Sequence, residues 1–538
     1  MKGPEAQSSL PARSAPAAPP RPELSPSRVA VLLFVLVGLA FGGWQLVSRG
    51  TPAADAKSNS IPVYAPYVDV TQTPTYPFQL PSASPVSSVY LAFVVSDPSH
   101  LCKPSWGARY TLDQAGQSLD LDARTAQLRQ EGGSVMVSFG GRDNTELAVG
   151  CTDERKLADA YRAPLERYHA TLIDLDLEGA ALTDEAANGR RARAVAAVQR
   201  ELAGRHVSLR VWLTLPVSSG GLTAEGLAAV KAMLAAHVKL AGVDAMAMNF
   251  GSVETVPGAM TGVVERALAA TQAQVQSLWR AGGLPSTTAS AWGHVGVTVM
   301  LGTNDTAGER FTPEDARTLA AFVSRHGIPR VSAWSLNRDA ACGGAFPRTG
   351  IVSDTCSGVL QSPLQFTRIF ASLKGTKIAS GEAGSRTMQA SPETGRADDP
   401  STSPYPIWRP TAAYGTGYKV VWQHEIYQAS WWTQDTPPDA VGAGPPSGPW
   451  QPIGPVAAGS HAPKLVLLVR KAIPVWSPTA VYRQGDRASF GGLPYQARWY
   501  TQGDQPLDNL PADPGTPWQP LFKFPGEPTV VSVGTEAS

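Results

Sequence analysis

Two kinds of apolar pattern alternate along the chain from about residue 61 to residue 375. Short runs rich in Val, Leu and aromatic residues are typical of buried strands, and longer segments between them repeat apolar residues at helical spacing. The strand-like runs are 61–70, 88–95, 134–139, 171–178, 208–215, 242–249, 295–301 and 330–336. Strands that alternate with helices in this way predict an α/β fold, a TIM (β/α)8 barrel over residues 61–375.

Three acids occupy alternate positions of the run at 171–178: Asp174, Asp176 and Glu178. Successive side chains of a strand point to opposite faces, so the three carboxyls share one face. Like charges roughly 6–7 Å apart, two strand rises, disfavour full ionisation, so at least one carboxyl keeps its proton to a higher pH. Such a group is suited to protonate a leaving group. A solvated strand face is the alternative interpretation.

An uncharged apolar run at residues 29–48 is long enough to cross a bilayer as a helix. Basic residues precede it, so the positive-inside rule predicts a cytoplasmic tail at 1–28 and export of the remainder. We expect a single transmembrane helix that anchors an extracytoplasmic protein to the membrane. Cleavage as a signal peptide, near Ala54-Asp55-Ala56, is the alternative.

The cysteine content indicates the cellular compartment, and the net charge argues against one class of partner. Four cysteines fit an oxidising compartment, with Cys102 paired to Cys151 and Cys342 to Cys356; free buried thiols are the alternative. The 45 basic and 44 acidic residues give a net charge of +1, which argues against a nucleic-acid partner. No His or Cys spacing suggests a metal site, so we expect neither metal nor cofactor. No pattern indicates an oligomer, and we expect a monomer.

The C-terminal part contains an internal repeat. Residues 376–404 are rich in Ser, Thr, Gly and Pro and predict a flexible linker. Beyond them, residues 405–455 and 473–522 share aromatic, Pro, Gly and Thr positions at a constant offset of 68 residues, for example Trp450 and Trp518. Each unit is too small for a large core and predicts short strands. Residues 464–471, between the units, predict one more strand without an assigned role.

Adjacent aromatic residues recur in both repeats as Trp431-Trp432 and Trp499-Tyr500. On a strand, one ring of each pair faces inward while the other is exposed. An exposed flat ring among polar neighbours is suited to stack on sugar rings. The alternatives are that all these rings are structural, or that they stack on bases, which the near-neutral charge disfavours.

Taken together, the chain resembles the chitinases of glycoside hydrolase family 18, followed by two modules similar to carbohydrate-binding module families 5 and 12. The fourth-strand signature D-x-x-D-x-D-x-E is matched by Asp174, Asp176 and Glu178, with Thr171 in place of the first Asp. Ser138-Phe139-Gly140-Gly141 matches the third-strand signature S-x-G-G. Residues 300–305 and 334–339 resemble the motifs of the last two strands.

The resemblance implies a role for each acid. Glu178 protonates the glycosidic oxygen, and the N-acetyl oxygen of the substrate acts as the nucleophile in place of a second carboxylate. Asp176 orients the acetamido group, and Asp174 shares a proton with Asp176. Trp334 forms the floor of the sugar site, with an ordinary core position as the alternative. The other implied substrate-binding residues are Ser138, Gly140, Gly141, Met248 and Asn249.

The sixth-strand motif departs from the family. Many relatives carry M-x-Y-D, whereas this chain has Met246-Ala247-Met248-Asn249, followed by Phe250. Asn249 can hydrogen-bond the acetamido group through its carbonyl or its amide, but it cannot ionise. We expect a chitinase that acts with retention and is targeted by two modules. The alternatives are an inactive chitin-binding or wall-binding lectin and a hydrolase of another N-acetylglucosamine glycan.

Overall fold

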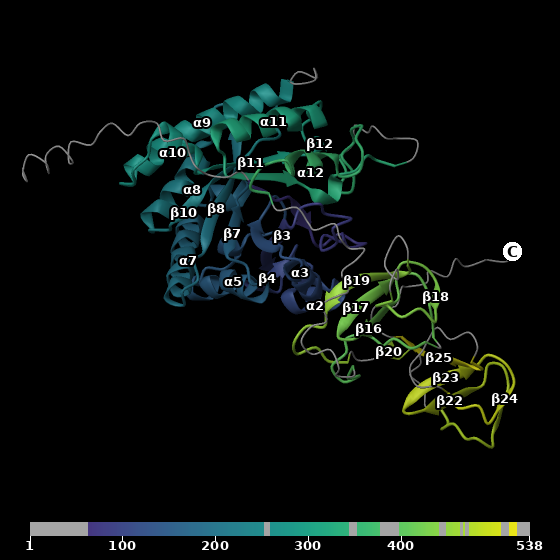
Figure 1. The fold of residues 1–538 in the computed structure, drawn as a ribbon. Helices are drawn as coiled ribbons and strands as arrows, with labels where there is room; N and C mark the ends of the chain where they lie inside the picture. Colours follow the sequence, from purple (N-terminus) through teal and green to yellow (C-terminus); the bar gives the residue numbers. More distant parts are fainter. Residues whose placement is uncertain are drawn as a thin grey trace, which may run out of the picture. The chain divides into compact units, whose positions relative to one another are not determined.

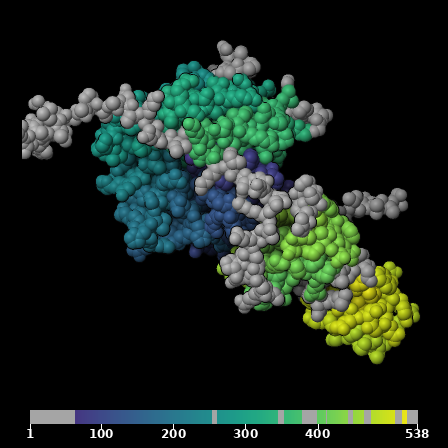
Figure 2. Space-filling view, viewed as in Figure 1, coloured from purple at the N-terminus to yellow at the C-terminus, as the bar shows by residue number. Residues whose placement is uncertain are grey.

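The structure is a computed structural model that describes residues 63–251, 259–343, 352–376, 398–410, 412–440, 448–462, 466–467, 473–506 and 516–523. The chain divides into two compact units, 1–56 and 57–538, and every described residue belongs to the second. In Figures 1 and 2 the colour runs along the sequence from purple to yellow.

Residues 63–376, here called the α/β domain, are built around a mixed sheet of twelve strands. Most neighbours in the sheet pair in parallel, in the order β1-β14-β11-β10-β8-β7-β6-β3. These strands are β1 (Val63–Tyr64), β3 (Ser88–Asp97), β6 (Ser134–Gly140), β7 (Leu172–Asp176), β8 (Arg210–Ser218), β10 (Leu240–Met246), β11 (Val295–Met300) and β14 (Arg330–Trp334).

The first segment of the domain joins the two ends of this order. β1 pairs with β14, and β2 (Tyr67–Asp69) pairs with β3, both in parallel. Pro66 lies between them and has no N–H to donate, yet its carbonyl accepts from Tyr90 N at 2.9 Å. The parallel strands therefore close into a ring, and their carboxyl ends meet on one side of it.

Helices cover the outside of the ring (Figure 1). α11 illustrates why they begin where they do, because the Thr312 hydroxyl accepts from Asp315 N at 3.3 Å and Pro313 opens the first turn. The helices are α2 (Leu112–Ser118), α3 (Leu121–Gln130), α4 (Leu147–Gly150), α5 (Glu154–Arg167), α6 (Gly179–Thr183), α7 (Glu185–Gly204), α8 (Ala224–Ala235), α9 (Ala259–Ala281), α10 (Thr288–Trp292), α11 (Pro313–His326) and α12 (Gln365–Phe370).

Side chains on the two faces of the ring differ in kind. Ile173, Leu175 and Leu177 are fully buried in the large aliphatic core. The interior instead holds large aromatic rings, among them Tyr67 and Trp212, in a separate cluster. The predicted alternation on β7 therefore places aliphatic residues on one face and leaves the other for polar groups.

The predicted fold class requires correction. The sheet is not a plain set of eight parallel strands, because β4 (His100–Trp106), β5 (Tyr110–Thr111) and β9 (Gly221–Leu222) extend it in antiparallel pairs. No helix within the described residues is long and apolar enough to cross a membrane. Even α9, with 23 residues, carries Glu265, Arg266 and Arg280. The predicted span at 29–48 lies outside the described residues. The chain is thus a mixed α/β domain followed by β modules.

The two repeats have the same strand arrangement, shifted by 68 residues. Each contains a two-stranded and a three-stranded antiparallel sheet. The first repeat has β15 (Ala413–Tyr414), β16 (Lys419–Trp422), β17 (Glu425–Ala429), β18 (Thr433–Gln434) and β19 (Trp450–Pro455). The second has β21 (Val481–Tyr482), β22 (Arg487–Phe490), β23 (Leu493–Ala497), β24 (Thr501–Gln502) and β25 (Trp518–Pro520). Edge-to-face packing of Trp450 on Tyr414 recurs as Trp518 on Tyr482.

Three further expectations concern the strand at 464–471, the cysteine pairs and the linker. The extra strand expected at 464–471 is present as β20 (Val466–Leu467), which pairs with β26 (Phe522–Lys523) and so extends the second repeat. Both cysteine pairs are disulfide-bonded, Cys102 to Cys151 and Cys342 to Cys356, which confirms the expected pairing. Most of the predicted linker, residues 377–397, lies outside the described residues.

Candidate active site

The acids of the fourth-strand signature lie at the carboxyl end of β7. Asp174 and Asp176 are on the strand and are 0% and 4% exposed. Glu178 follows the strand in an extended conformation, directly before α6, and is half-buried. Burial therefore decreases from Asp174 to Glu178, as expected for acids that lead from the interior of the ring to its opening.

Asp174 is held by four donors inside the ring. Ser138 Oγ and Tyr67 OH donate to Oδ2 at 2.6 and 2.8 Å. Thr214 Oγ1 and Arg330 Nη1 donate to Oδ1 at 2.7 and 2.8 Å. Both oxygens accept two hydrogen bonds each, so the carboxyl group is fixed in orientation. The expected sharing of a proton with Asp176 stays a prediction.

A buried cation, Arg330, was not identified in the sequence as part of the site. It lies at the start of β14, where its guanidinium pairs with Asp174 and is 3.4 Å from Asp244. Its charged group also stacks over the Tyr90 ring, 4.2 Å from the centroid. Two acids inside the ring thus share one arginine. The sequence did contain a signal for this buried pair: a charged residue lies in each of two mostly apolar strands, Asp244 in β10 and Arg330 in β14.

Asp176 retains its proton more firmly than an ordinary aspartate. Burial raises its pKa well above the usual range, and the charges of Glu178 and Asp174 raise it further. Its Oδ1 has no hydrogen-bond partner among the described residues. A buried, protonated carboxyl with an unused oxygen can donate or accept a hydrogen bond when a substrate arrives.

Glu178 has the pKa of a general acid that works near neutral pH. Burial raises its pKa to about 7, and this rise is opposed by Arg142 and supported by the charges of Asp305 and Asp143. A large fraction of Glu178 is therefore protonated near pH 7 and can release its proton during a reaction. The sequence predicted one carboxyl of this kind among the three acids.

The S-x-G-G motif has a steric reason in this structure. Gly140 has a φ of +100°, and a Cβ at this position would lie 2.0 Å from the Asp176 carbonyl oxygen. At Gly141, with a φ of +80°, a Cβ would lie 2.7 Å from the Phe93 ring. Only glycine allows the end of β6 to approach β7 and Phe93 this closely.

An aromatic surface adjoins the acids at the end of β14. The Trp334 ring is half-buried and stacks on Phe93 with centroids 5.2 Å apart and an interplanar angle of 18°. Tyr67, which donates to Asp174, lies 6.2 Å from the same ring. Trp334 is therefore not sealed in the core, and the structure brings it together with the acids through Tyr67.

The sixth-strand residues lie just beyond β10. Met248 is buried, while Asn249 is exposed and has a φ of +57°. The Asn249 carbonyl accepts from Thr306 N at 3.1 Å, and its amide nitrogen donates to Asp305 at 3.4 Å. Each end of the Asn249 side chain therefore keeps one position for a ligand, a hydrogen on the nitrogen and a lone pair on the oxygen. Phe250 packs against the aliphatic core.

The aromatic pairs of the repeats are both exposed, contrary to the expected alternation. Trp431 and Trp432 are 43% and 61% exposed, and Trp499 and Tyr500 are 44% and 64% exposed. The reason is that they lie between strands, after β17 and after β23, where the backbone is not extended in a sheet. Each repeat thus presents two large rings to solvent instead of one.

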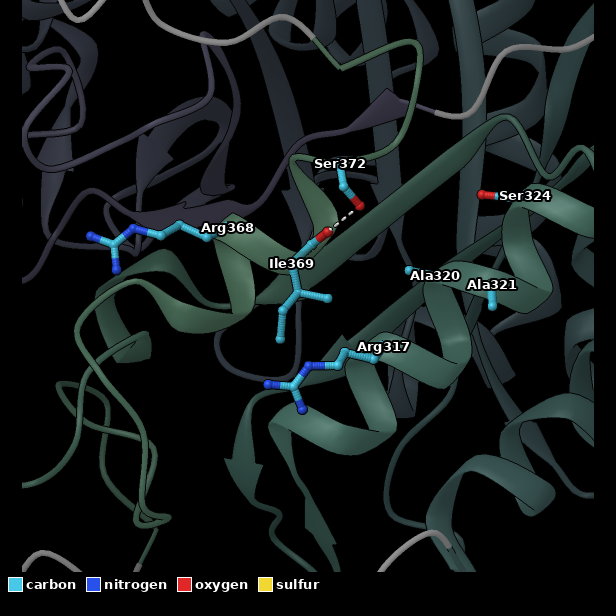
Figure 3. Close-up of a pocket in the computed structure, with 7 residues that line it drawn as sticks. All are labelled: Arg317, Ala320, Ala321, Ser324, Arg368, Ile369 and Ser372. Carbon is cyan, nitrogen blue, oxygen red and sulfur yellow. Dashed lines mark hydrogen bonds between the residues drawn. The ribbon is translucent and has the colours of Figure 1, made fainter.

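A surface groove elsewhere in the α/β domain does not coincide with these acids. It lies between α11 and α12 and encloses about 370 Å³ (Figure 3). It is lined by Arg317, Ala320, Ala321, Ser324, Arg368, Ile369 and Ser372, and it contains no carboxylate. No group of three or more His, Cys, Asp or Glu side chains in the described part of the chain is arranged to hold a metal ion.

Comparisons with known proteins give two kinds of similarity. Residues 475–519 match carbohydrate-binding module family 5/12. Over 281 residues, 52% of the chain, it is 34% identical to a probable bifunctional chitinase/lysozyme of Escherichia coli K12 and 32% identical to endochitinase 11 of Metarhizium anisopliae. These stretches cover 31% and 52% of the two relatives, so the chain spans about a third and about half of their lengths.

A solved structure is also similar. The catalytic domain of a chitinase from Pyrococcus furiosus is 24% identical, with a TM-score of 0.49, over 58% of this chain and 96% of that one. The homology to chitinases that the sequence suggested is confirmed over about half of the chain, and residues 475–519, in the second repeat, match carbohydrate-binding module family 5/12.

Proposed function

We propose that this protein is a chitinase. It hydrolyses β-1,4 links of N-acetylglucosamine polymers, retains the anomeric configuration and uses the acetamido group of the substrate as nucleophile. The observation that carries the proposal is the half-buried Glu178 at the end of β7, whose pKa is raised to about 7 beside the buried Asp176. The homology to chitinases supports the same activity.

Glu178 is proposed as the general acid and, later, the general base. It gives its proton to the oxygen of the glycosidic bond as that bond breaks and the acetamido oxygen bonds to the anomeric carbon. A cyclic oxazolinium ion results, and the leaving sugar departs with a new hydroxyl. Glu178 then takes a proton from water as the water attacks the anomeric carbon and opens the ring, which restores the acid.

Asp176 is proposed to hold the acetamido group. Its raised pKa and its unpartnered Oδ1 support a hydrogen bond to the acetamide as positive charge develops there. Asp174 and Arg330 are proposed to act deeper in the ring than Asp176. There they form a buried ion pair, in which the positive charge of Arg330 offsets that of the acid. This arrangement is electrostatic stabilisation by groups already in place before the substrate binds.

The remaining substrate contacts are proposals of the same kind. Trp334, supported by its stacking on Phe93, is assigned to the floor beneath the reacting sugar. Asn249 is assigned to donate through the free hydrogen of its amide nitrogen, whose position is fixed by Asp305. Ser138, Gly140, Gly141 and Met248 shape the site from β6 and from the end of β10.

Both C-terminal repeats are proposed as carbohydrate-binding modules, at 405–455 and 473–522. The match to family 5/12 covers the second repeat only, and the support for the first is its identical strand pairing and its exposed Trp431 and Trp432. Two weak binding sites on one chain keep the enzyme near an insoluble polymer, because the second contact forms at high effective concentration. The two disulfides support a location outside the cytoplasm.

A hydrolase of another N-acetylglucosamine polymer is a second candidate. It is favoured by the name of the first relative, a probable bifunctional chitinase/lysozyme. Cleavage of peptidoglycan would use the same acid and the same acetamido group. The presence of a family 5/12 module, together with the endochitinase relative, favours chitin as the substrate.

The decisive experiment compares the full chain with its Glu178→Gln variant on soluble chitin oligosaccharides and on peptidoglycan. We expect the parent to release shorter oligosaccharides and the variant to be slower by roughly 10²-fold or more, the scale of a lost general acid. Products from peptidoglycan alone would favour the second candidate.

Binding without products from either protein would identify a lectin. Equal rates for parent and variant would remove Glu178 from the mechanism.

A further inference from the structure

Asp305 joins residues that follow two other strands. It lies between β12 (Gly302–Thr303) and β13 (Arg310–Phe311), after β11. Its Oδ2 is 2.9 Å from Arg142 Nη1, just after β6, and 3.4 Å from Asn249 Nδ2, just after β10. Around the ring, β6 and β11 are separated by β7, β8 and β10 on one side and by β3, residues 63–69 and β14 on the other. The ion pair therefore crosses the opening at the carboxyl ends of the strands.

The loop that carries Asp305 also fixes Asn249. Thr306 N donates to the Asn249 carbonyl at 3.1 Å, so the amide nitrogen faces Asp305. Glu309, farther along the same loop, accepts from Gly251 N at 2.6 Å. Asn249 itself carries no charge, and the carboxylate that its amide nitrogen contacts is that of Asp305.

Glu178 faces charged groups from three elements. Arg142 and Asp143 follow β6, Asp305 follows β11, and Asp176 is on β7, the strand that leads to Glu178. The positive charge of Arg142 favours loss of the Glu178 proton, whereas Asp305 favours its retention. Their ion pair therefore joins two residues whose charges shift the proton equilibrium of Glu178 in opposite directions.

We propose that Asp305 and Arg142 are positioning residues for the reaction at Glu178. They form a pair of opposite charges tied across the opening where Glu178 lies, and Asp305 of this pair orients the Asn249 amide. This inference rests on the proposed function only in that Glu178 is the acid. Both side chains are accessible, 69% exposed for Arg142 and 35% for Asp305, so their replacement leaves the core intact.

The test measures the titration of Glu178 directly. The full chain is labelled with ¹³C at glutamate carboxyls, and the Glu178 resonance is identified by its absence from Glu178→Gln. We expect Asp305→Asn to lower the pKa of Glu178 and Arg142→Gln to raise it, each by roughly half a pH unit or more for one nearby charge. Arg142→Lys, which keeps the charge, should stay closer to the parent than Arg142→Gln does.

Activity gives a second readout. The alkaline limb of kcat/KM on a soluble oligosaccharide should move down in pH for Asp305→Asn and up for Arg142→Gln. The matched control is Arg317→Gln, which removes the exposed pair of Arg317 with Glu314 on α11 and should change neither measurement.

A purely structural ion pair predicts a different result, because either single variant breaks the same bond. Shifts in the same direction, or no shift of the Glu178 titration in either variant, would overturn the inference. The titration needs no turnover, so a parent that cleaves no substrate would refute the proposed function while leaving this result readable.

Discussion

Glu178 and Asp174 are four residues apart and lie in different surroundings. Asp174 receives four hydrogen bonds, one of them from the buried Arg330. Glu178 has no comparable set of donors, and burial raises its pKa to about 7. One short segment thus provides a fixed negative charge in the interior and a transferable proton at the opening.

The raised pKa of Glu178 has a cost in stability that can be measured. The folded state favours protonated Glu178, whereas an unfolded glutamate ionises near its usual value of 4.5. The stability that the folded state gains from protonated Glu178 is fully present below pH 4.5 and is lost as the pH rises through about 7. The Tm of the parent should therefore fall relative to that of Glu178→Gln as the pH rises from 5 to 8, by on the order of 2 °C. Thermal unfolding followed by circular dichroism checks this.

A Tm difference between Glu178→Gln and the parent that does not change with pH would contradict the titration assigned to Glu178.

Among the elements, the junction of β6 with β7 sets the distance between the motif glycines and the acids. The Cβ of an alanine at position 140 would lie 2.0 Å from the Asp176 carbonyl oxygen, which is backbone and cannot rotate away. Any side chain there must therefore push the end of β7 outward. The glycine is required by the packing of one strand on its neighbour.

Gly140→Ala should accordingly destabilise the protein by roughly 2 kcal/mol or more and reduce kcat, because both strain and displacement of Asp176 follow. Gly132→Ala is the matched control, since its φ is also positive, +76°, but no atom lies within 4 Å of its Cβ position. Urea unfolding and kcat of the two variants are compared. Equal losses would show that the left-handed backbone, rather than the contact with β7, is what matters.

How much of the site the sequence could predict depends on how local the information is. The acids of β7 share a face because of strand geometry alone, and the motif glycines are adjacent in sequence to Ser138. Arg330 on β14 and Asp305 in the loop after β12 lie more than a hundred residues farther along, and only closure of the ring brings Arg330 to Asp174 and Asp305 to Arg142. The exposure of Trp431 together with Trp432 depended on a turn that the alternation rule did not include.

On the scale of the whole molecule, two kinds of surface are proposed to serve one substrate. The α/β domain carries the acids, while each repeat exposes a pair of aromatic rings. Rings that are more than 40% exposed are costly to keep in water and are typical of binding surfaces. We expect the repeats to determine binding to the insoluble polymer and the acids to determine the rate of hydrolysis.

The double variant Trp432→Ala/Tyr500→Ala tests this division. We expect binding to insoluble chitin to weaken roughly tenfold or more, as for loss of central aromatic contacts, with hydrolysis of short soluble oligosaccharides nearly unchanged. Sedimentation with chitin measures the first and product analysis the second. Val475→Ala, which truncates another residue of the second repeat that is 79% exposed, is the control. Equal losses on soluble and insoluble substrates would contradict the targeting role.

The position of Arg330 on the strand that completes the ring has a consequence for synthesis of the chain. Within the part of the chain that the structure describes, the one arginine that donates to Asp174 lies 156 residues farther along. A nascent polypeptide that has not yet released β14 from the ribosome holds Asp174 and Asp244 without their shared counter-ion, and burial of either acid is then strongly unfavourable. We therefore expect the interior of the ring to form only once β14 is available.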